Sequence, residues 1–355
     1  HILFNPLASD KETYRLSVLF ISLIIPILLF FSIKKKYGKF DNYLICLLAI
    51  IVLLSPYFRT SAFWGLGENY GLIFLILSYL SFQKLKEKSN IKLADKYFGT
   101  FLVCLFSSLT IYFDQKLIFA PLLIFFLIQF NKFSYKIKLL SLICFFLFAL
   151  PYLYLIKIWG SIIPTAAADA RKVGLSIHFF QPIFCLTVIS IYILPFFLFF
   201  KKKLNFKKIV TQKVDQNFLI ILFIFTIYFL LASYFESFNN LSNDGKGAFF
   251  KVSKIFIENN VLRLILTYIV SIISIFIIYF FFRKKKSDFL FIFYFLFLSL
   301  FTYPFYQEYL DPLIYILLFT FFKTNLDIKR RNVYFFVLYF LVFSLGAKFY
   351  YQIIL

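Results

Sequence analysis

Residues 261–282 read VLRLILTYIVSIISIFIIYFFF, and Arg283-Lys284-Lys285-Lys286 follows directly. The stretch contains one charged residue, Arg263, and it exceeds the run of about 20 apolar residues that a helix needs to cross a bilayer. The basic run that ends it is typical of the cytoplasmic end of a membrane-spanning helix. This segment predicts a transmembrane helix.

The composition extends this prediction to the whole chain. Of its 355 residues, 62% are hydrophobic, 24% are aromatic and 15% are charged, and the mean hydropathy is +0.87. Soluble domains average about 45–50% apolar and about 25% charged residues, so a water-soluble globule is excluded. Gly and Pro number 10 each and Cys numbers four, which excludes collagen and disulfide scaffolds. We predict an all-α, polytopic integral membrane protein.

Hydrophobic runs between charge clusters predict about 12 transmembrane helices in a single multi-span domain, residues 1–355. The predicted spans are 15–33, 42–57, 70–83, 97–113, 116–131, 138–157, 181–200, 217–235, 261–282, 288–304, 311–323 and 332–351. Several are short, which tight hairpins, tilt or bilayer thinning can accommodate.

The basic residues alternate between the two sides of this map. Of the 38 Lys and Arg residues, 26 fall in alternate loops, so that one face carries a charge of +20 and the other +2. The positive-inside rule makes the basic face cytoplasmic and places both chain ends outside. The net charge of +22 is then a topology signal and not a sign of nucleic-acid binding. We expect a multi-pass protein of a bacterial inner membrane or the endoplasmic reticulum.

The chain starts at His1 and contains no Met. We expect that its first span and part of its first outer loop are missing, with a cleaved signal peptide as the alternative.

No Walker lysine, GxGxxG, HExxH or GxSxG motif is present. Cys46, Cys104, Cys144 and Cys185 lie in or beside apolar spans without metal-ligand spacing, and we expect small buried side chains. No metal site or other cofactor is predicted, and dependence on a divalent metal stays open.

Five outer segments hold the polar residues that suit chemistry. The first, 55–69, contains Arg59, whose planar donors suit a phosphate, although it can equally snorkel at the membrane interface. The second is Asp114-Gln115-Lys116 at a tight hairpin, where turn chemistry alone also favours Asp. The third, 159–180, holds Asp169, Arg171 and His178 and leads to Gln181.

The fourth segment, 236–260, reads as a flexible polar loop, and the fifth, 303–312, carries Gln307, Glu308 and Asp311 between two prolines. Ionisable groups at membrane depth are costly and mark sites. Carboxylates, amides, His and Arg gathered on one face beneath aromatic rings suit a sugar delivered on a lipid phosphate, and a carboxylate can activate an acceptor hydroxyl.

These patterns give the expected site. The phosphate-side residues are Arg59 and Lys116. The remaining substrate-binding residues are Asn69, Asp114, Gln115, Asp169, Arg171, His178, Gln181, Gln307 and Glu308. The catalytic residue is unknown: we expect an acid upstream of His1, and Asp10, Asp169 and His178 are weaker candidates.

Four short motifs carry a family resemblance over most of the chain: Thr13-Tyr14-Arg15-Leu16-Ser17, Asp114-Gln115, Ala168-Asp169-Ala170-Arg171 with His178 and Gln181, and Gln307-Glu308-Tyr309 with Asp311-Pro312. Together they resemble the GT-C class of polyprenyl- or dolichyl-phosphate-sugar-dependent membrane glycosyltransferases. The nearest family is the dolichyl-phosphate-glucose alpha-1,2-glucosyltransferases of lipid-linked oligosaccharide synthesis. The chain departs from that family's pattern, since Asp114 stands where the family has Arg and no Arg follows Gln307.

The resemblance implies a GT-C-like fold and transfer of a hexose from a polyprenyl-phosphate sugar to a lipid-linked acceptor on the extracytoplasmic face. Its partners would be the bilayer, the lipid-phosphate donor and the lipid-linked glycan acceptor. A polysaccharide polymerase or ligase is an alternative, but Arg171 is the only Arg well inside an outer loop. A transporter or lipid flippase is another, and it would require buried charges at mid-membrane, of which the predicted spans contain almost none.

Overall fold

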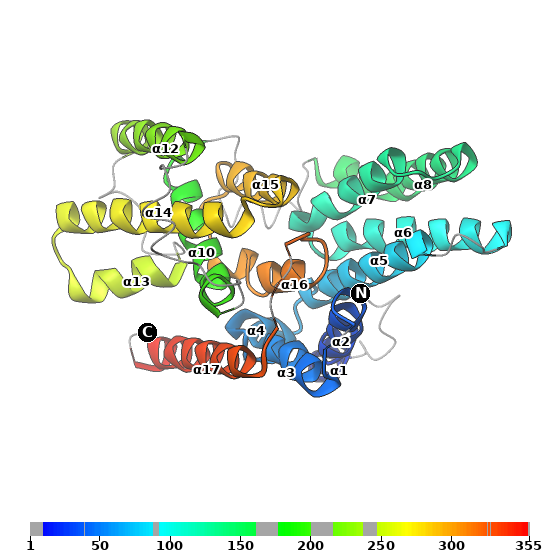
Figure 1. The fold of residues 1–355 in the computed structure, drawn as a ribbon, viewed down its shortest axis with the longest axis horizontal. Coiled ribbons are helices and arrows are strands. Elements are labelled where there is room, and N and C mark those ends of the chain that lie inside the picture. Colours follow the sequence, from blue (N-terminus) through cyan, green and yellow to red (C-terminus); the bar gives the residue numbers. More distant parts are fainter. Residues whose placement is uncertain are drawn as a thin grey trace. The chain divides into compact units, whose positions relative to one another are not determined.

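The computed structural model describes residues 10–38, 40–87, 92–160, 177–199, 216–236, 247–324, 326 and 328–353, and every regular element among them is a helix (Figure 1). Contacts divide the chain into two compact units. Unit 1 comprises His1–Ala167 with Phe319–Phe321, and unit 2 comprises Ala168–Leu318 with Phe322–Leu355.

Unit 1 is a set of helices that pack on their neighbours in the sequence. α5 packs along α6, α6 packs on α7 and α8, and α1 packs on α4 (Figure 1). Its elements are α1 Lys11–Ser22, α2 Ile24–Lys36, α3 Asn42–Ile50, η1 Ile51–Leu54, α4 Pro56–Trp64, α5 Glu68–Glu87, α6 Leu93–Phe113, η2 Gln115–Ile118, α7 Phe119–Phe130 and α8 Tyr135–Trp159.

Unit 2 is organised around α10. This helix packs on α13, α14, α15 and α17, and 83% of its apolar window is buried. By contrast, only 11% of α12 is buried. The elements of unit 2 are α10 Gln181–Phe199, α12 Gln216–Phe235, α13 Gly247–Phe256, α14 Asn260–Phe282, η4 Lys286–Asp288, α15 Phe289–Ser299, η5 Gln307–Tyr309, α16 Leu313–Phe319 and α17 Arg330–Ile353.

Seven helical segments of the described chain are long and apolar enough to cross a bilayer. They are Lys11–Lys36, Leu93–Phe113, Tyr135–Trp159, Gln181–Leu198, Gln216–Phe235, Asn260–Phe282 and Arg330–Phe349. An eighth is added if Asn42–Leu54 and Pro56–Trp64, which meet at a bend of 64°, count as one span. The chain is therefore an all-α, multi-pass membrane protein, as predicted, but the structure does not support the predicted count of 12.

Four predicted spans lack the length or the apolar character of a crossing. The span predicted at 70–83 belongs to α5, which carries polar residues such as Asn69, Ser78 and Lys84, and 116–131 forms a helical stretch of only 16 residues, Gln115–Phe130. The spans predicted at 288–304 and 311–323 contain α15 with 11 residues and α16 with seven. At 1.5 Å per residue these helices extend about 16 Å and about 10 Å, against a hydrocarbon core of about 30 Å.

The prediction of a transmembrane span at 311–323 was wrong for a physical reason. Hydropathy does not distinguish a lipid-facing helix from one enclosed by protein. Residues 313–319 are all buried, and Tyr315 is 2% exposed. The chain that follows is held by Asp288, whose carboxylate accepts hydrogen bonds from the backbone N–H of Lys323 and of Thr324, each at 2.9 Å. Irregular backbone is tolerated at membrane depth where protein surrounds it, and this segment meets that condition.

Local sequence explains the bend before α4. Ser55 stands at the N-cap, where its hydroxyl accepts a hydrogen bond from the Phe58 N–H at 3.0 Å, and Pro56 occupies the first helical position. α4 then buries Phe58 and leaves Phe63 and Trp64 more than half exposed. Exposed aromatic rings of this kind are enriched at membrane–water interfaces.

The four cysteines are free thiols. Cys104, Cys144 and Cys185 are buried, as predicted, but Cys46 is exposed on α3. The prediction for Cys46 was wrong because an apolar helix run does not reveal which of its faces packs on protein.

Candidate functional site

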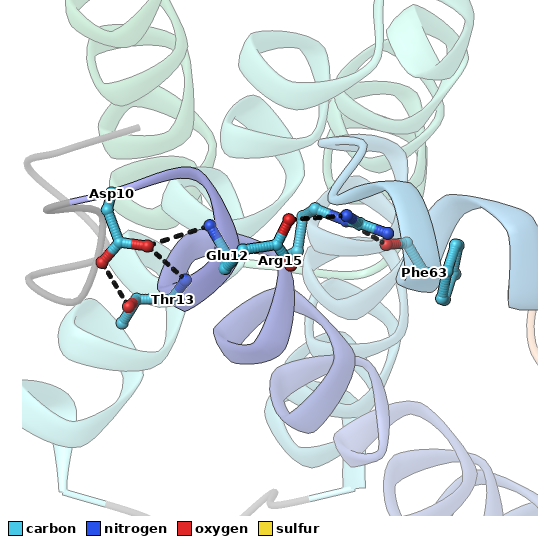
Figure 2. Close-up of polar contacts among 5 residues, drawn as sticks. All are labelled: Asp10, Glu12, Thr13, Arg15 and Phe63. Atoms are coloured by element: carbon cyan, nitrogen blue, oxygen red, sulfur yellow. Dashed lines mark hydrogen bonds and ion pairs between the residues drawn. The ribbon is translucent and has the colours of Figure 1, made fainter.

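In unit 1, Arg15 ties α1 to α4 (Figure 2). Its Nε donates to the Phe63 carbonyl at 3.0 Å and its Nη1 pairs with Glu12 Oε1 at 2.9 Å. The guanidinium carbon also lies 4.6 Å from the centroid of the Phe63 ring and 5.2 Å from that of Trp64. The Arg15 donors and π-face are thus engaged by protein groups, which indicates an anchoring role.

Asp10 lies at the start of the same helix and caps it. Its Oδ1 accepts hydrogen bonds from the backbone N–H of Glu12 at 3.0 Å and of Thr13 at 2.9 Å (Figure 2). A carboxylate in this position satisfies the first donors of a helix and complements its dipole. The geometry gives Asp10 a structural reason to be present.

A second polar group in unit 1 joins α4, α5 and the hairpin after α6. The Tyr57 hydroxyl donates to Glu68 Oε1 at 2.9 Å, and Lys116 Nζ pairs with Asp114 Oδ2 at 3.1 Å. The Lys116 ammonium also lies 5.5 Å from the centroid of the Tyr57 ring. Two segments that the sequence assigned to the outer face, 55–69 and 114–116, therefore meet.

Asp114 is the buried member of this group. Burial raises the pKa of its carboxyl above the ordinary value of 3.8, the Lys116 ammonium opposes that change, and the neighbouring Glu68 carboxylate adds to it. The hairpin can pack this closely because residue 71 is glycine: a Cβ there would lie 3.2 Å from Asp114 Cβ and 3.0 Å from Leu117 Cδ1.

The other predicted residues of unit 1 have different surroundings. Asn69 is 2% exposed, and its Nδ2 donates to Ser22 Oγ at 2.9 Å and to the Phe58 carbonyl at 3.3 Å, so its amide serves helix packing. Gln115 is half-buried at the start of η2, beside Asp114 and Lys116. Arg59 is exposed on α4.

In unit 2, His178 lies just before the start of α10 and Glu236 just after the end of α12, and the two side chains lie together. His178 Nδ1 is 3.9 Å from Glu236 Oε1, and Glu236 Oε2 accepts a hydrogen bond from the Phe180 N–H at 3.0 Å. The His178 ring stacks on Tyr303, with 4.6 Å between centroids. Its backbone N–H donates to the Leu300 carbonyl at 2.8 Å, which fixes the imidazole against the segment that follows α15.

The predicted amides Gln181 and Gln307 bind that same segment to α10. Gln181 Oε1 accepts a hydrogen bond from the Phe305 N–H at 2.9 Å. Its Nε2 is buried and has no hydrogen-bond acceptor among the residues that the structure describes. Buried donors without a partner are uncommon in proteins, and Gln181 as a whole is 0% exposed.

Gln307 makes a directed hydrogen-bond chain. Its Oε1 accepts from the Ala248 N–H at 2.9 Å, so its Nε2 is left to donate to the Tyr192 hydroxyl at 3.1 Å. The Tyr192 hydroxyl in turn lies within hydrogen-bond reach of the Asp311 side chain. Tyr192 follows Gln181 by 11 positions on α10, about 16 Å along the helix axis. Residues 303–312 therefore descend to about half the depth of a hydrocarbon core of about 30 Å.

The structure brings His178, Gln181 and Gln307 together in unit 2, with Glu308 half-buried beside Gln307 in η5. Asp169 and Arg171 lie outside the described residues. Sequence reasoning did not select Tyr192 or Glu236 for the site. Tyr192 is a polar side chain inside an apolar run, and Glu236 is an acid at the end of one, so each carried a weak signal.

The unit 2 group offers amide donors and acceptors, an imidazole beside a carboxylate, and aromatic faces. Such groups bind hydroxyls, move protons and stack on apolar faces of a ligand. Within the part of the chain that the structure describes, no cluster of three or more His, Cys, Asp or Glu residues could hold a metal ion. Comparison of the chain with protein-family models, with curated proteins and with solved structures found no match.

Proposed function

We propose that the protein is a membrane glycosyltransferase of GT-C type. It would transfer a hexose from a polyprenyl-phosphate donor to a lipid-linked acceptor on the extracytoplasmic face. The observation that carries this proposal is the meeting of His178, Gln181 and Gln307 around α10 of unit 2. Polar groups are costly in a membrane unit, and a site for a polar ligand gives a reason to gather them.

The unit 2 group has the chemistry that a sugar ligand needs. Gln307 supplies a half-buried amide and Glu308 beside it a half-buried carboxylate, and such groups bind hydroxyls. Tyr303 and His178 present stacked rings, and aromatic rings stack on apolar sugar faces. These features support the substrate class.

Glu236 is a base candidate within this group. Its Oε1 lies 3.9 Å from His178 Nδ1, longer than a hydrogen bond, and distances between catalytic groups often shorten only when substrate binds. Glu308, which follows Gln307 in η5, is the second base candidate.

Arg59 and Lys116 are the phosphate-side residues of this proposal. Arg59 is exposed on α4, and the ammonium of Lys116 is paired with Asp114 at 3.1 Å. A guanidinium can bind two phosphate oxygens at once. Phosphate binding by Lys116 would first require its separation from a buried carboxylate.

The test is transfer activity of the full-length protein in membranes, supplied with polyprenyl-phosphate hexoses and lipid-linked acceptors. Gln307→Ala and His178→Ala should each lower turnover about 100-fold, the effect of a displaced substrate. Gln129→Ala is the matched control, because its amide donates to Ser141 Oγ and the Lys138 carbonyl in unit 1. Unchanged turnover in both site variants would reject the proposal.

A transporter is the second candidate, and Asp311 is the observation that favours it. This carboxylic acid is 2% exposed and lies beside Tyr192, about halfway along a spanning helix. Buried acids at such depth serve proton and substrate pathways in transporters. Proteoliposomes would distinguish the two functions: Asp311→Asn should abolish a proton or solute flux if the protein transports, and no flux in the wild type would remove this candidate.

A further inference from the structure

Unit 2 contains an apolar groove of about 480 Å³ between α12 and the helices α10, α14 and α15. Its walls are almost entirely hydrocarbon: Leu186 on α10, Ile224 on α12, Ile278 on α14 and Leu296 on α15 are representative. Three of the four helices are long and apolar enough to span a bilayer. The groove therefore lies at the depth of the lipid chains.

The groove runs lengthwise through this layer. It is lined along α15 from Phe289 to Leu300, which is 11 positions and about 16 Å of helix. α15 is short of a full crossing, and the groove follows its whole length. An occupant must therefore be elongated and lie along the helices.

The groove opens sideways. α12 is only 11% buried, and the lining residues Ile224, Phe293 and Phe297 are 59%, 66% and 59% exposed. These side chains belong to the surface that faces lipid. A chain from the surrounding bilayer can enter between them without leaving hydrocarbon, whereas water has no polar partners there.

One end of the groove adjoins polar groups. Leu300 lines the groove while its carbonyl accepts a hydrogen bond from the His178 N–H at 2.8 Å. Tyr228 lines it while its hydroxyl donates to the Phe179 carbonyl at 2.6 Å. An occupant with an apolar tail and a polar head would place its head at this end.

We propose that the groove holds one acyl chain of a bilayer glycerophospholipid as a retained lipid. The stabilisation comes from dispersion contacts with the groove-lining side chains of α12, such as Ile221 and Ile224, while Phe225 of the same helix already packs on Tyr268 of α14. Lipid tails are as apolar as the lining residues, so no hydrophobic gain is expected, and retention depends on shape. This inference is independent of the glycosyl-transfer proposal.

The experiment uses the purified full chain in nanodiscs of phosphatidylcholine that contain a phosphatidylcholine with a mid-chain diazirine. After photolysis, peptide mapping should place the label mainly within 221–228 and 289–300. The reference surface is the lipid-facing side of α8, where Phe146 and Leu153 are more than half exposed. Equal labelling of α8 and the groove helices would overturn the proposal, because it would mean ordinary annular lipid.

Two variants test the geometry. Ile224→Trp and Leu296→Trp fill the groove and should lower labelling of 289–300 at least about tenfold, the change that a loss of 1.4 kcal/mol produces. Leu230→Trp is the matched control, since Leu230 is 64% exposed on α12 and does not line the groove. If the filling variants do not fold, the wild-type labelling pattern still decides whether the groove holds a lipid chain.

Displacement of the phosphatidylcholine label by an equimolar polyprenyl phosphate would overturn the assignment of the occupant.

Discussion

Gln307 and Tyr192 join the segment after α15 to the middle of α10, with 3.1 Å between Gln307 Nε2 and the Tyr192 hydroxyl. Because Gln307 Oε1 is held by the Ala248 N–H, the amide cannot reverse its orientation without losing that bond. The contact therefore fixes the position of the predicted site residue and links α10 to the start of α13.

We predict that Tyr192→Phe destabilises the fold by about 0.5–1.5 kcal/mol, the net contribution of a typical hydrogen bond, here from the half-buried Gln307 amide. Tyr192 is 1% exposed, so water cannot replace the lost hydroxyl. The measurement is thermal unfolding in detergent beside Tyr154→Phe, in which the hydroxyl belongs to a side chain that is 64% exposed. Equal unfolding temperatures for the two variants would show that the Gln307 contact contributes nothing.

Gly247 gives a prediction about α13. Its φ is +78°, and a Cβ would lie 2.5 Å from Val188 Cγ2 on α10. Gly247→Ala combines left-handed strain of about 1–2 kcal/mol with overpacking of about 1–3 kcal/mol, so we expect a clear fall in unfolding temperature. Adding Val188→Ala to the Gly247→Ala variant should restore the stability lost to overpacking but not the stability lost to left-handed strain.

Gly346 is the matched position for that experiment. It lies within α17, and a Cβ there would meet no atom within 4 Å. Gly346→Ala should stabilise by about 0.5–1 kcal/mol because it limits the unfolded chain. A loss of stability at Gly346 comparable to that at Gly247 would contradict the packing described for α10 and α13.

The pH dependence of stability should carry a contribution from Asp114. Its folded-state pKa is raised by burial, so protonation favours the folded state. The stabilisation is full below the unfolded value near 3.8 and is lost as the pH rises through the raised folded-state pKa. Wild type should therefore lose stability relative to Asp114→Asn as the pH rises above the ordinary value of 3.8.

Unfolding temperatures of the two proteins across that range are the measurement. Asp95→Asn is the control, since Asp95 is exposed at the start of α6. A difference that changes in the opposite direction would mean that the ion pair with Lys116 outweighs the burial of the carboxyl.

Hydropathy predicted α14 almost to the residue, 261–282 against Asn260–Phe282, because lipid surrounds much of that helix and the basic run ends it. It was wrong at α16, where the same apolar residues are enclosed by protein and the chain turns after Phe319. Burial alone does not explain the difference, since 83% of the apolar window of α10 is buried and its predicted span 181–200 still matches Gln181–Phe199. α10 and α14 are long enough to cross a bilayer, whereas the seven-residue α16 is not, and hydropathy does not show where an apolar run ends its helix.

The site shows the same division. Gln181, Gln307 and His178 were predicted because polar residues are scarce in this chain, and all three lie together in unit 2. Tyr192 and Glu236 were missed because their role depends on which distant segment reaches them. Periodicity does not encode a contact such as that between Gln307 and residue 192, which are 115 positions apart.

Arg15 and Arg59 offer a test that separates anchoring from ligand binding. Arg15 uses its planar donors and its π-face against Glu12, Phe63 and Trp64, with a side-chain exposure of 19%. A lysine ammonium cannot reproduce that fork, so Arg15→Lys should lower the unfolding temperature, with a loss of about 1–2 kcal/mol for the hydrogen bonds. Arg59→Lys keeps the charge of an exposed residue and should lower that temperature less than Arg15→Lys does.

Transfer assays complete the comparison, because a phosphate ligand at Arg59 would require its bidentate geometry. Arg59→Lys should then raise the KM for a polyprenyl-phosphate donor about tenfold, which corresponds to 1.4 kcal/mol of binding. Arg15→Lys should affect turnover only in proportion to the folded protein that remains. If instead Arg15→Lys raises the donor KM in protein of normal stability, Arg15 contacts the ligand and the assignment of these two arginines is reversed.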